Sequence, residues 1–150
     1  MKYLVTGSAG FIGFRLCQRL LDSGHEVVGI DNMNAYYDQG LKQSRLHILE
    51  HYPHFRFIPL DITDREKVVV LCTQEDFDRV IHLAAQAGVR YSLQNPFAYA
   101  DSNLNGHLAI LEGCRQANVK HLVYASSSSV YGISNQTPFS TDMPTDHPVS

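Results

Sequence analysis

Short apolar runs alternate with segments of helical periodicity along this chain, and this alternation constrains its fold more than any other feature. The apolar runs predict strands over residues 3–5, 26–30, 55–59, 79–83 and 121–125. The segments between them predict helices over residues 11–23, from about 40 to 52, over 64–74 and from 95 to about 117. Strands that are separated by helices pair in parallel, and both faces of such a sheet are buried. The sequence therefore predicts an α/β fold with a parallel sheet.

Composition excludes several classes of protein. Of the 150 residues, 44% are hydrophobic and the formal net charge is −3, so a disordered chain is excluded. Lys and Arg are scattered and fewer than Asp and Glu, which argues against binding to nucleic acid or to a membrane surface. Three separated cysteines without a CxxC pair, and no long apolar run, predict a cytoplasmic protein with reduced thiols.

Local signals set the ends of helices and the extent of the domain. Gly24 is expected to end the first helix, and Thr63 or Asp64 to cap the third. His47 and His51 are spaced i,i+4 and could hold a metal with His54, but Pro53 breaks the helix before the third histidine. We expect surface histidines and no metal site. From 134 to 150 the composition shifts to Ser, Thr, Asp and Pro, which predicts a loop-like tail.

A glycine-rich turn joins the first predicted strand to the first helix. It reads Thr6-Gly7-Ser8-Ala9-Gly10-Phe11-Ile12-Gly13, with GxxGxxG spacing. The first glycine permits a tight turn, the second lets the backbone approach a pyrophosphate, and the third lets the helix pack closely. The helix N-terminus then offers N–H groups and a partial positive charge to phosphates. The turn predicts a dinucleotide site; a glycine turn without a ligand is the alternative.

Asp31 stands at the end of the second predicted strand, where it bears on the choice of cofactor. A carboxylate at this place can accept both ribose hydroxyls of an adenosine, and it repels the 2′-phosphate of NADP. No Lys or Arg follows closely in the sequence, Lys42 being the first. The sequence therefore predicts NAD as the cofactor. A simple cap at the strand end is the alternative.

The glycine turn resembles that of the extended short-chain dehydrogenase/reductase superfamily, the NAD-dependent epimerases and dehydratases. Further segments agree with this resemblance in chain order, at 61–64, 82–90, 103–106 and 125–132. The resemblance is greatest to nucleotide-sugar 4-epimerases, in particular those acting on UDP-glucuronate. It implies a Rossmann-type doubly wound parallel sheet, with residues 1–133 as the NAD-binding domain and 134–150 as a tail.

The resemblance also implies a set of functional residues. Those expected at the cofactor are Gly7, Gly10, Phe11, Ile12, Gly13, Asp31, Asn32, Asp61, Ile62, Leu83, Ala84, Ala85 and Asn103. Alignment back from Val130-Tyr131-Gly132 places Ser127 at the catalytic hydroxyl, within a serine run that leaves the register open by one residue. Ser128 and Ser129 are expected beside the nucleotide-sugar. Arg90 is expected at its phosphate or carboxylate, with a structural ion pair as the alternative.

The implied reaction proceeds through a 4-keto intermediate. In this family NAD stays bound, removes hydride from C4 of the sugar and returns it to the opposite face after the sugar turns over. Three groups serve the reaction: a Tyr base, a Lys that lowers its pKa, and a Ser or Thr hydroxyl at the C4 oxygen. A phenol with an ordinary pKa near ~10 is a poor base at neutral pH until a cation favours its ionised form.

None of the eight tyrosines of this chain is followed by a lysine four positions later. In the family this pair comes shortly after a stretch like 145–150. We therefore expect the chain to be the N-terminal part of an epimerase, without the C-terminal substrate domain. We expect this part to be inactive alone, and the complete protein to form a homodimer. The alternatives are a non-catalytic dinucleotide-binding module and a nucleotide-sugar 4,6-dehydratase. Dehydratases carry an Asp-Glu pair where this chain has 127–130, which counts against them.

Overall fold

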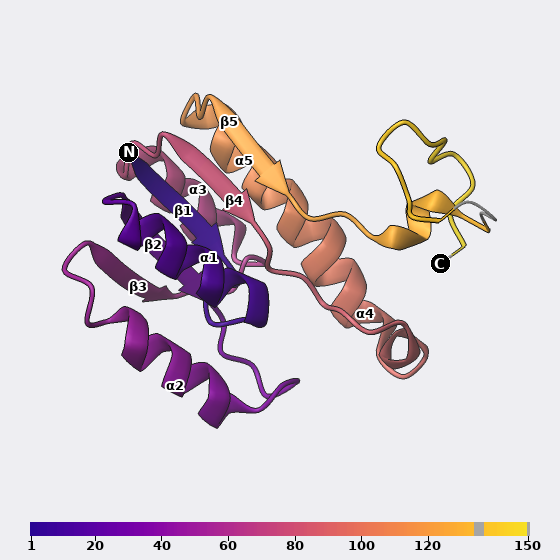
Figure 1. Ribbon diagram of the computed structural model, residues 1–150, viewed down its shortest axis with the longest axis horizontal. Helices are drawn as coiled ribbons and strands as arrows, with labels where there is room; N and C mark the ends of the chain where they lie inside the picture. Colours follow the sequence, from indigo (N-terminus) through magenta and orange to yellow (C-terminus); the bar gives the residue numbers. More distant parts are fainter. Residues whose placement is uncertain (134–136, 150) are drawn as a thin grey trace.

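A computed structural model of the chain describes residues 1–133 and 137–149. Its centre is a sheet of five parallel strands in the order β3-β2-β1-β4-β5 (Figure 1). The strands are β1 (Lys2–Thr6), β2 (Glu26–Asp31), β3 (Phe55–Pro59), β4 (Arg79–His82) and β5 (His121–Tyr124). The chain runs outward from β1 to β3 and then crosses to β4 on the other side of β1. The predicted doubly wound parallel sheet is confirmed.

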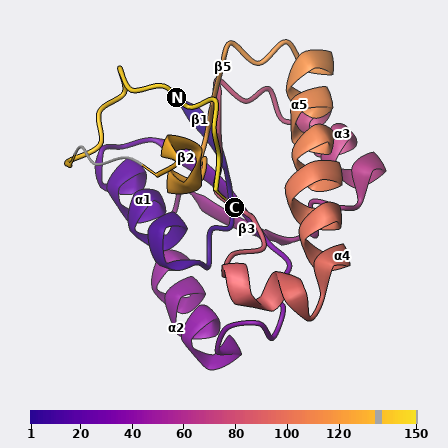
Figure 2. The ribbon, with the colours of Figure 1, turned by 90° about the vertical axis from the view of Figure 1, so that its right-hand side faces the viewer.

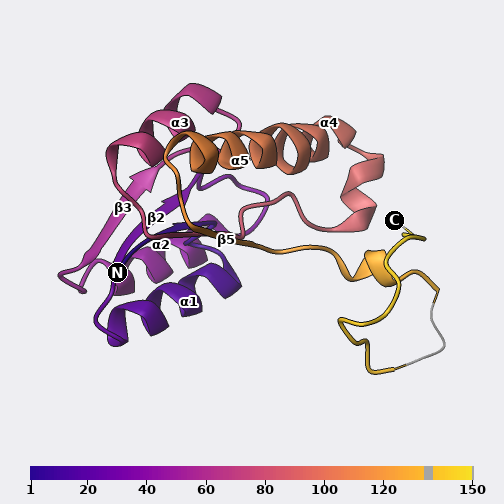
Figure 3. The ribbon, with the colours of Figure 1, turned by 90° about the horizontal axis from the view of Figure 1, so that it is seen from above.

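Helices cover both faces of this sheet. They are α1 (Phe11–Asp22), α2 (Gln39–Leu49), α3 (Arg65–Gln74), α4 (Pro96–Tyr99) and α5 (His107–Gln116). Helices α1 and α2 lie on one face, and α3 and α5 lie on the other (Figures 2 and 3). Two apolar clusters fill the layers between helices and sheet.

The strands alternate their side chains between the two clusters, as a period of two requires. In β1, Tyr3 and Val5 pack with α1, whereas Leu4 packs with α3 and α5. Leu4 and Val5 have no exposed surface. Burial of one such side chain contributes roughly 1.5–3 kcal/mol to folding. This two-sided burial explains why the strands read as unbroken apolar runs in the sequence.

Most helix ends follow the signals in the sequence. Gly24 follows α1 with a φ of +77°, and its N–H donates to the carbonyl of Leu21 at 2.9 Å. Asp64, one of the two expected caps of α3, accepts from the N–H of Lys67 at 3.3 Å. The predicted helix from 95 to about 117 is instead a succession of α4, a π-helical segment at Ala100–Gly106 and α5. π-Helical segments are rare, and they occur frequently at functional sites.

The segment after β5 leads away from the sheet (Figure 1). Its described part contains the 3₁₀ turn Ser128–Tyr131, and residues 137–149 form neither helix nor strand. Tyr131 stacks on Phe139 with ring centroids 4.7 Å apart. The predicted tail at 134–150 lies partly outside the described residues, namely at 134–136 and 150. Among the described helices, none combines the length and apolarity needed to cross a membrane.

Candidate functional site

A cavity of about 620 Å³ lies at the carboxyl ends of the strands. Its walls come from the glycine turn, the end of β2, the start of α2, the segment after β3 and the segment after β4. This place lies where the strand order reverses between β1 and β4. Ligands of open α/β sheets bind in the crevice at such a switch point.

Two glycines of the turn are required by the turn itself. Gly7 has a φ of +70°, and its N–H donates to the carbonyl of Ile30 at the end of β2 at 2.8 Å. A Cβ on Gly13 would lie 2.1 Å from the carbonyl oxygen of Gly7. Gly13 therefore lets the start of α1 pack closely, and the group that it approaches is the backbone of the turn itself.

Gly10 has a different environment from its two neighbours in the motif. A Cβ there would meet only the carbonyl oxygen of Gly7, at 3.0 Å, and Gly10 lines the cavity. Gly10 is also the N-cap of α1, has no side-chain cap, and precedes a first turn without acidic residues. The N–H groups at this helix end are thus available to an anion in the cavity.

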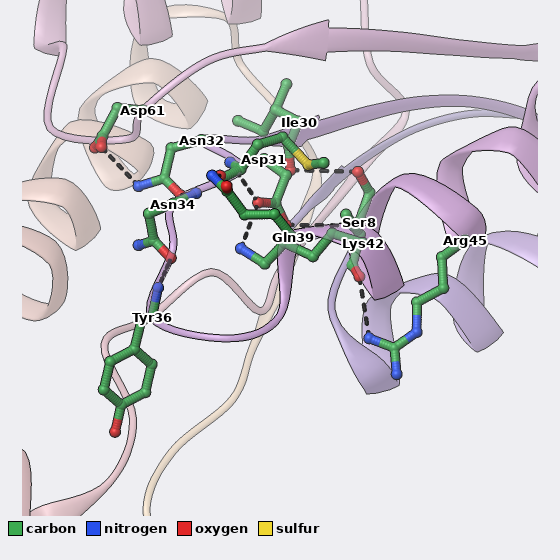
Figure 4. Close-up of polar contacts among 12 residues, drawn as sticks. Ser8, Ile30, Asp31, Asn32, Asn34, Tyr36, Gln39, Lys42, Arg45 and Asp61 are labelled. Carbon is green, nitrogen blue, oxygen red and sulfur yellow. Dashed lines mark hydrogen bonds and ion pairs between the residues drawn. The ribbon is translucent and has the colours of Figure 1, made fainter.

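Asp31 is a buried carboxylate whose two oxygens carry unequal numbers of hydrogen bonds (Figure 4). Its Oδ1 accepts from the N–H of Met33 at 2.9 Å and from Nζ of Lys42 at 3.1 Å. Its Oδ2 accepts from the N–H of Ala9 at 3.3 Å. A carboxylate offers about four acceptor positions, so the free one here is on Oδ2.

No Lys or Arg follows Asp31 closely in the sequence, but the fold places Lys42 beside it. After the segment 32–38, α2 passes beside the end of β2 and brings Lys42 into a buried ion pair with Asp31. Arg45, three positions further along α2, also lines the cavity. Its Nη1 donates to the carbonyl of Ala9 at 3.2 Å. The capping carboxylate of Asp38 starts this helix by accepting from the N–H of Leu41 at 2.9 Å.

Asp61 and Asn32 fix the segment after β3 against the end of β2. Nδ2 of Asn32 donates to Oδ2 of Asp61 at 2.7 Å, and Thr63 donates to Oδ1 through its N–H and its hydroxyl. Burial opposes the charge of Asp61, but the hydrogen bonds from Asn32 and Thr63 hold its pKa below the ordinary value. Ile62, beside it, lines the cavity, whereas Asp61 does not.

Thr6 and His82 hold the segment after β4. The Thr6 hydroxyl accepts from the N–H groups of Leu83 and Ala84 at 3.1 and 2.9 Å, and lies 2.7 Å from Nδ1 of His82. Because both lone pairs of the hydroxyl are used, its proton points at Nδ1, and His82 carries its own proton on Nε2. Burial and the neighbouring His107 lower the pKa of His82 to about 4. A neutral imidazole therefore supports this wall of the cavity.

Asn103 acts on the cavity through the backbone. It lies in the π-helical segment and makes two hydrogen bonds to Gln86, donating to its carbonyl at 2.9 Å and accepting from its N–H at 2.8 Å. Gln86 lines the cavity and Asn103 does not. Asp61 and Asn103 thus support walls, whereas the other predicted cofactor residues line the cavity itself.

The predicted substrate residues lie outside the cavity wall. Ser127 follows β5, is exposed, and its Oγ accepts from the N–H of Ser129 at 3.1 Å. Ser128 is exposed and Ser129 is half-buried in the same 3₁₀ turn. Arg90 is exposed, and within the described residues it makes no ion pair at 4 Å or less. Ala125, two positions before Ser127, lines the cavity, so the serine run starts at its rim.

An aromatic contact links two segments at the cavity. Tyr36, on the cavity wall, lies with its ring centroid 4.9 Å from that of Tyr91 in the 3₁₀ turn Val89–Leu93. The hydroxyl of Tyr99 donates to the carbonyls of Ala87 and Gly88. Partial burial and the neighbouring tyrosines raise the pKa of Tyr36. These rings join the segment 32–38 to the segment after β4.

Sequence reasoning did not find Lys42, Arg45, Tyr36 or the Thr6–His82 pair. A usable signal existed for Lys42 and Arg45. Asp38 is a favourable helix cap, and the spacing i,i+3 places the two cations on the same side of the helix that it starts. For His82, the sequence offers only a polar residue at a buried strand end.

Together the glycine turn, the buried carboxylate at the end of β2 and the cavity at the switch point define an α/β domain of the dinucleotide-binding class. The chain belongs to the NAD dependent epimerase/dehydratase family, because the model of that family matches residues 3–150.

Named relatives agree with this assignment. A probable UDP-glucuronate 4-epimerase of Rhizobium meliloti is 45% identical over 150 residues, covering 100% of this chain and 44% of the relative. An uncharacterized 37.6 kDa protein of Escherichia coli O111:H- is 59% identical over 150 residues, covering 100% of this chain and 45% of the relative. The chain thus spans less than half the length of these relatives.

A solved structure shows the same fold. The UDP-glucuronic acid 4-epimerase of Bacillus cereus, in complex with UDP-glucuronic acid and NAD, superposes with a TM-score of 0.84 at 39% identity. The match covers 95% of this chain and 45% of that one. A UDP-glucose-4-epimerase of Stenotrophomonas maltophila with bound NAD gives a TM-score of 0.82 at 34% identity, over 96% of this chain and 42% of that one.

Proposed function

We propose that this chain binds NAD and forms the cofactor-binding part of a nucleotide-sugar 4-epimerase whose substrate is UDP-glucuronate. The observation that carries the proposal is the cavity at the switch point, with the uncapped N-terminus of α1 on one side and Asp31 on the other. The similarity to UDP-glucuronate 4-epimerases supports the sugar.

The residues present fit NAD. Gly10 leaves the backbone open where a pyrophosphate would lie, and a Cβ there would occupy the space on the cavity side. The free acceptor position on Oδ2 of Asp31 suits a ribose hydroxyl. Leu60 and Ile62 offer an apolar wall to the adenine, and Leu83 and Ala84 offer one further along the cavity. When bound, NAD supplies a reversible hydride acceptor for C4 of the sugar.

The chain's own residues would orient the reactants. The Ser127 hydroxyl, at the end of β5 beyond the cavity rim, would donate to the C4 oxygen of the sugar. Arg90 and the neighbouring Ser128 and Ser129 would contact the phosphates or the sugar carboxylate. No tyrosine among these 150 residues precedes a lysine by four positions. In the complete protein, the base and its lysine would therefore come from residues other than these 150. A homodimeric state and a cytoplasmic location stay predictions.

Two experiments test this proposal. Calorimetric titration of the chain with NAD should show one site, and the complete protein should convert UDP-glucuronate to its 4-epimer. Binding of NAD without conversion of UDP-glucuronate or UDP-glucose would favour a non-catalytic dinucleotide-binding module. Loss of water from UDP-glucose would favour a 4,6-dehydratase. Absence of NAD binding by both proteins would overturn the proposal.

A further inference from the structure

A buried ion pair lies on the cavity wall beside the carboxylate that was expected at the cofactor. Asp31 and Lys42 both line the cavity, and their side chains are only 7% and 9% exposed. Arg45 lines the same cavity, and its Nη1 donates to the carbonyl of Ala9 at 3.2 Å. The other carboxylate lining the cavity, Asp38, caps α2. Two cations and two carboxylates therefore balance at this end of the cavity.

The ammonium of Lys42 is held away from incoming anions by Asp31. Its one hydrogen bond in the described residues goes to Oδ1 of Asp31 at 3.1 Å. A buried charge that loses its partner carries a large penalty, and any new anion within reach can relieve it. The 2′-phosphate of NADP is such an anion, and it would enter beside the ribose-facing oxygen of Asp31.

We propose that Lys42 is a specificity-determining residue for the dinucleotide: paired with Asp31 it leaves NAD preferred, and released from Asp31 it binds the 2′-phosphate of NADP, with Arg45 as the second cation. This inference rests on the proposed NAD site. Simple repulsion by Asp31 would also disfavour NADP, but here the cations that would bind the phosphate are already in place on α2. One isosteric substitution, Asp31→Asn, should therefore open a site for NADP without any added basic residue.

The test is a cycle of four proteins: the complete protein, Asp31→Asn, Lys42→Met and the double variant. Dissociation constants for NAD and NADP are measured by calorimetry, and the readout is their ratio. Asp31→Asn should shift the ratio toward NADP by about 10- to 100-fold, the size of one hydrogen bond to a charged group. Lys42→Met added to Asp31→Asn should remove most of that shift.

Lys42→Met alone gives an independent measurement should Asp31→Asn not fold. It leaves the charge of Asp31 unopposed, so discrimination against NADP should increase. Lys67→Met is the matched control, because Lys67 is 74% exposed, pairs with Asp64 and does not line the cavity. It should leave the ratio unchanged.

The possible failures are distinguishable. If the unsubstituted protein binds no NAD, the proposed function falls and this inference falls with it. If NAD binds but the shift in Asp31→Asn persists in the double variant, repulsion by Asp31 alone sets the preference and the inference is overturned. A ratio that is unchanged in both single variants, or that Lys67→Met changes as much as Lys42→Met, also overturns it.

Discussion

Gly13→Ala and Gly10→Ala should separate folding from binding within one glycine turn. A Cβ on Gly13 would lie 2.1 Å from the carbonyl oxygen of Gly7 and 2.9 Å from its carbon. Both atoms belong to the backbone, so the start of α1 would have to move by roughly 1 Å or more to restore contact distance. Overpacking of this kind costs about 1–3 kcal/mol, and we expect the upper part of that range.

Gly10→Ala should do the opposite. A Cβ there meets one atom, the carbonyl oxygen of Gly7 at 3.0 Å, and otherwise enters open space on the cavity wall. The free energy of unfolding should fall by less than ~1 kcal/mol, since the residue keeps an ordinary φ of −72°. NAD affinity should fall at least about 10-fold, because the methyl group occupies the space for the pyrophosphate.

Urea unfolding gives the stability of each variant, and calorimetry gives the dissociation constant for NAD. Gly24→Ala is the matched control, because Gly24 is a glycine with no atom within 4 Å of a Cβ and lies outside the cavity. Its φ of +77° should cost about 1–2 kcal/mol of stability without an effect on NAD. Unchanged NAD affinity in Gly10→Ala, or equal stabilities for Gly10→Ala and Gly13→Ala, would refute this account of the turn.

Three further predictions concern other parts of the site. In the complete protein, Ser127→Ala should lower turnover by roughly 100-fold or more, as loss of a hydroxyl at the reacting oxygen does; a larger loss in Ser128→Ala than in Ser127→Ala would move the register. The pKa of His82 is lowered to about 4, so its contribution to the free energy of unfolding should be fully present above pH 6.5. Between pH 6.5 and 4 the unfolded chain binds this proton before the folded chain does, so the free energy of unfolding should decrease as the pH falls. The loss attributable to this group is about 3 kcal/mol, and urea unfolding of His82→Gln should show a flatter dependence in that window; an equal slope in both proteins would contradict the assignment. Tyr36→Ala should speed NAD dissociation by about 10-fold in stopped-flow experiments, since it removes the ring contacts with Tyr37 and Tyr91; an unchanged rate would mean that the segment 32–38 does not retain the ligand.

The sheet could be predicted from the sequence because each strand is an apolar run buried on both faces, and the helix signals between the runs fix parallel pairing. The glycine turn could be predicted because a positive φ at Gly7 and the close approach at Gly13 admit no other residue without strain. These are local or periodic properties, and the sequence records them directly.

The ion pair of Asp31 could not be predicted in the same way. Lys42 is eleven positions away, and its approach depends on the path of the segment 32–38 and on the angle at which α2 leaves it. Asp61 and Asn103 show the same limit. The sequence placed Asp61 after a strand and Asn103 within a helical segment, but their side chains bind neighbouring protein groups, and these contacts depend on tertiary packing.

The fate of the hydrogen at C4 tests the central claim most directly. The complete protein is incubated with UDP-glucuronate that carries deuterium at C4, in ordinary water, and the epimer is examined by NMR and mass spectrometry. If hydride leaves C4 for a bound nicotinamide and returns to the same carbon, the epimer keeps its deuterium at C4. An epimer with solvent hydrogen at C4 would contradict the account.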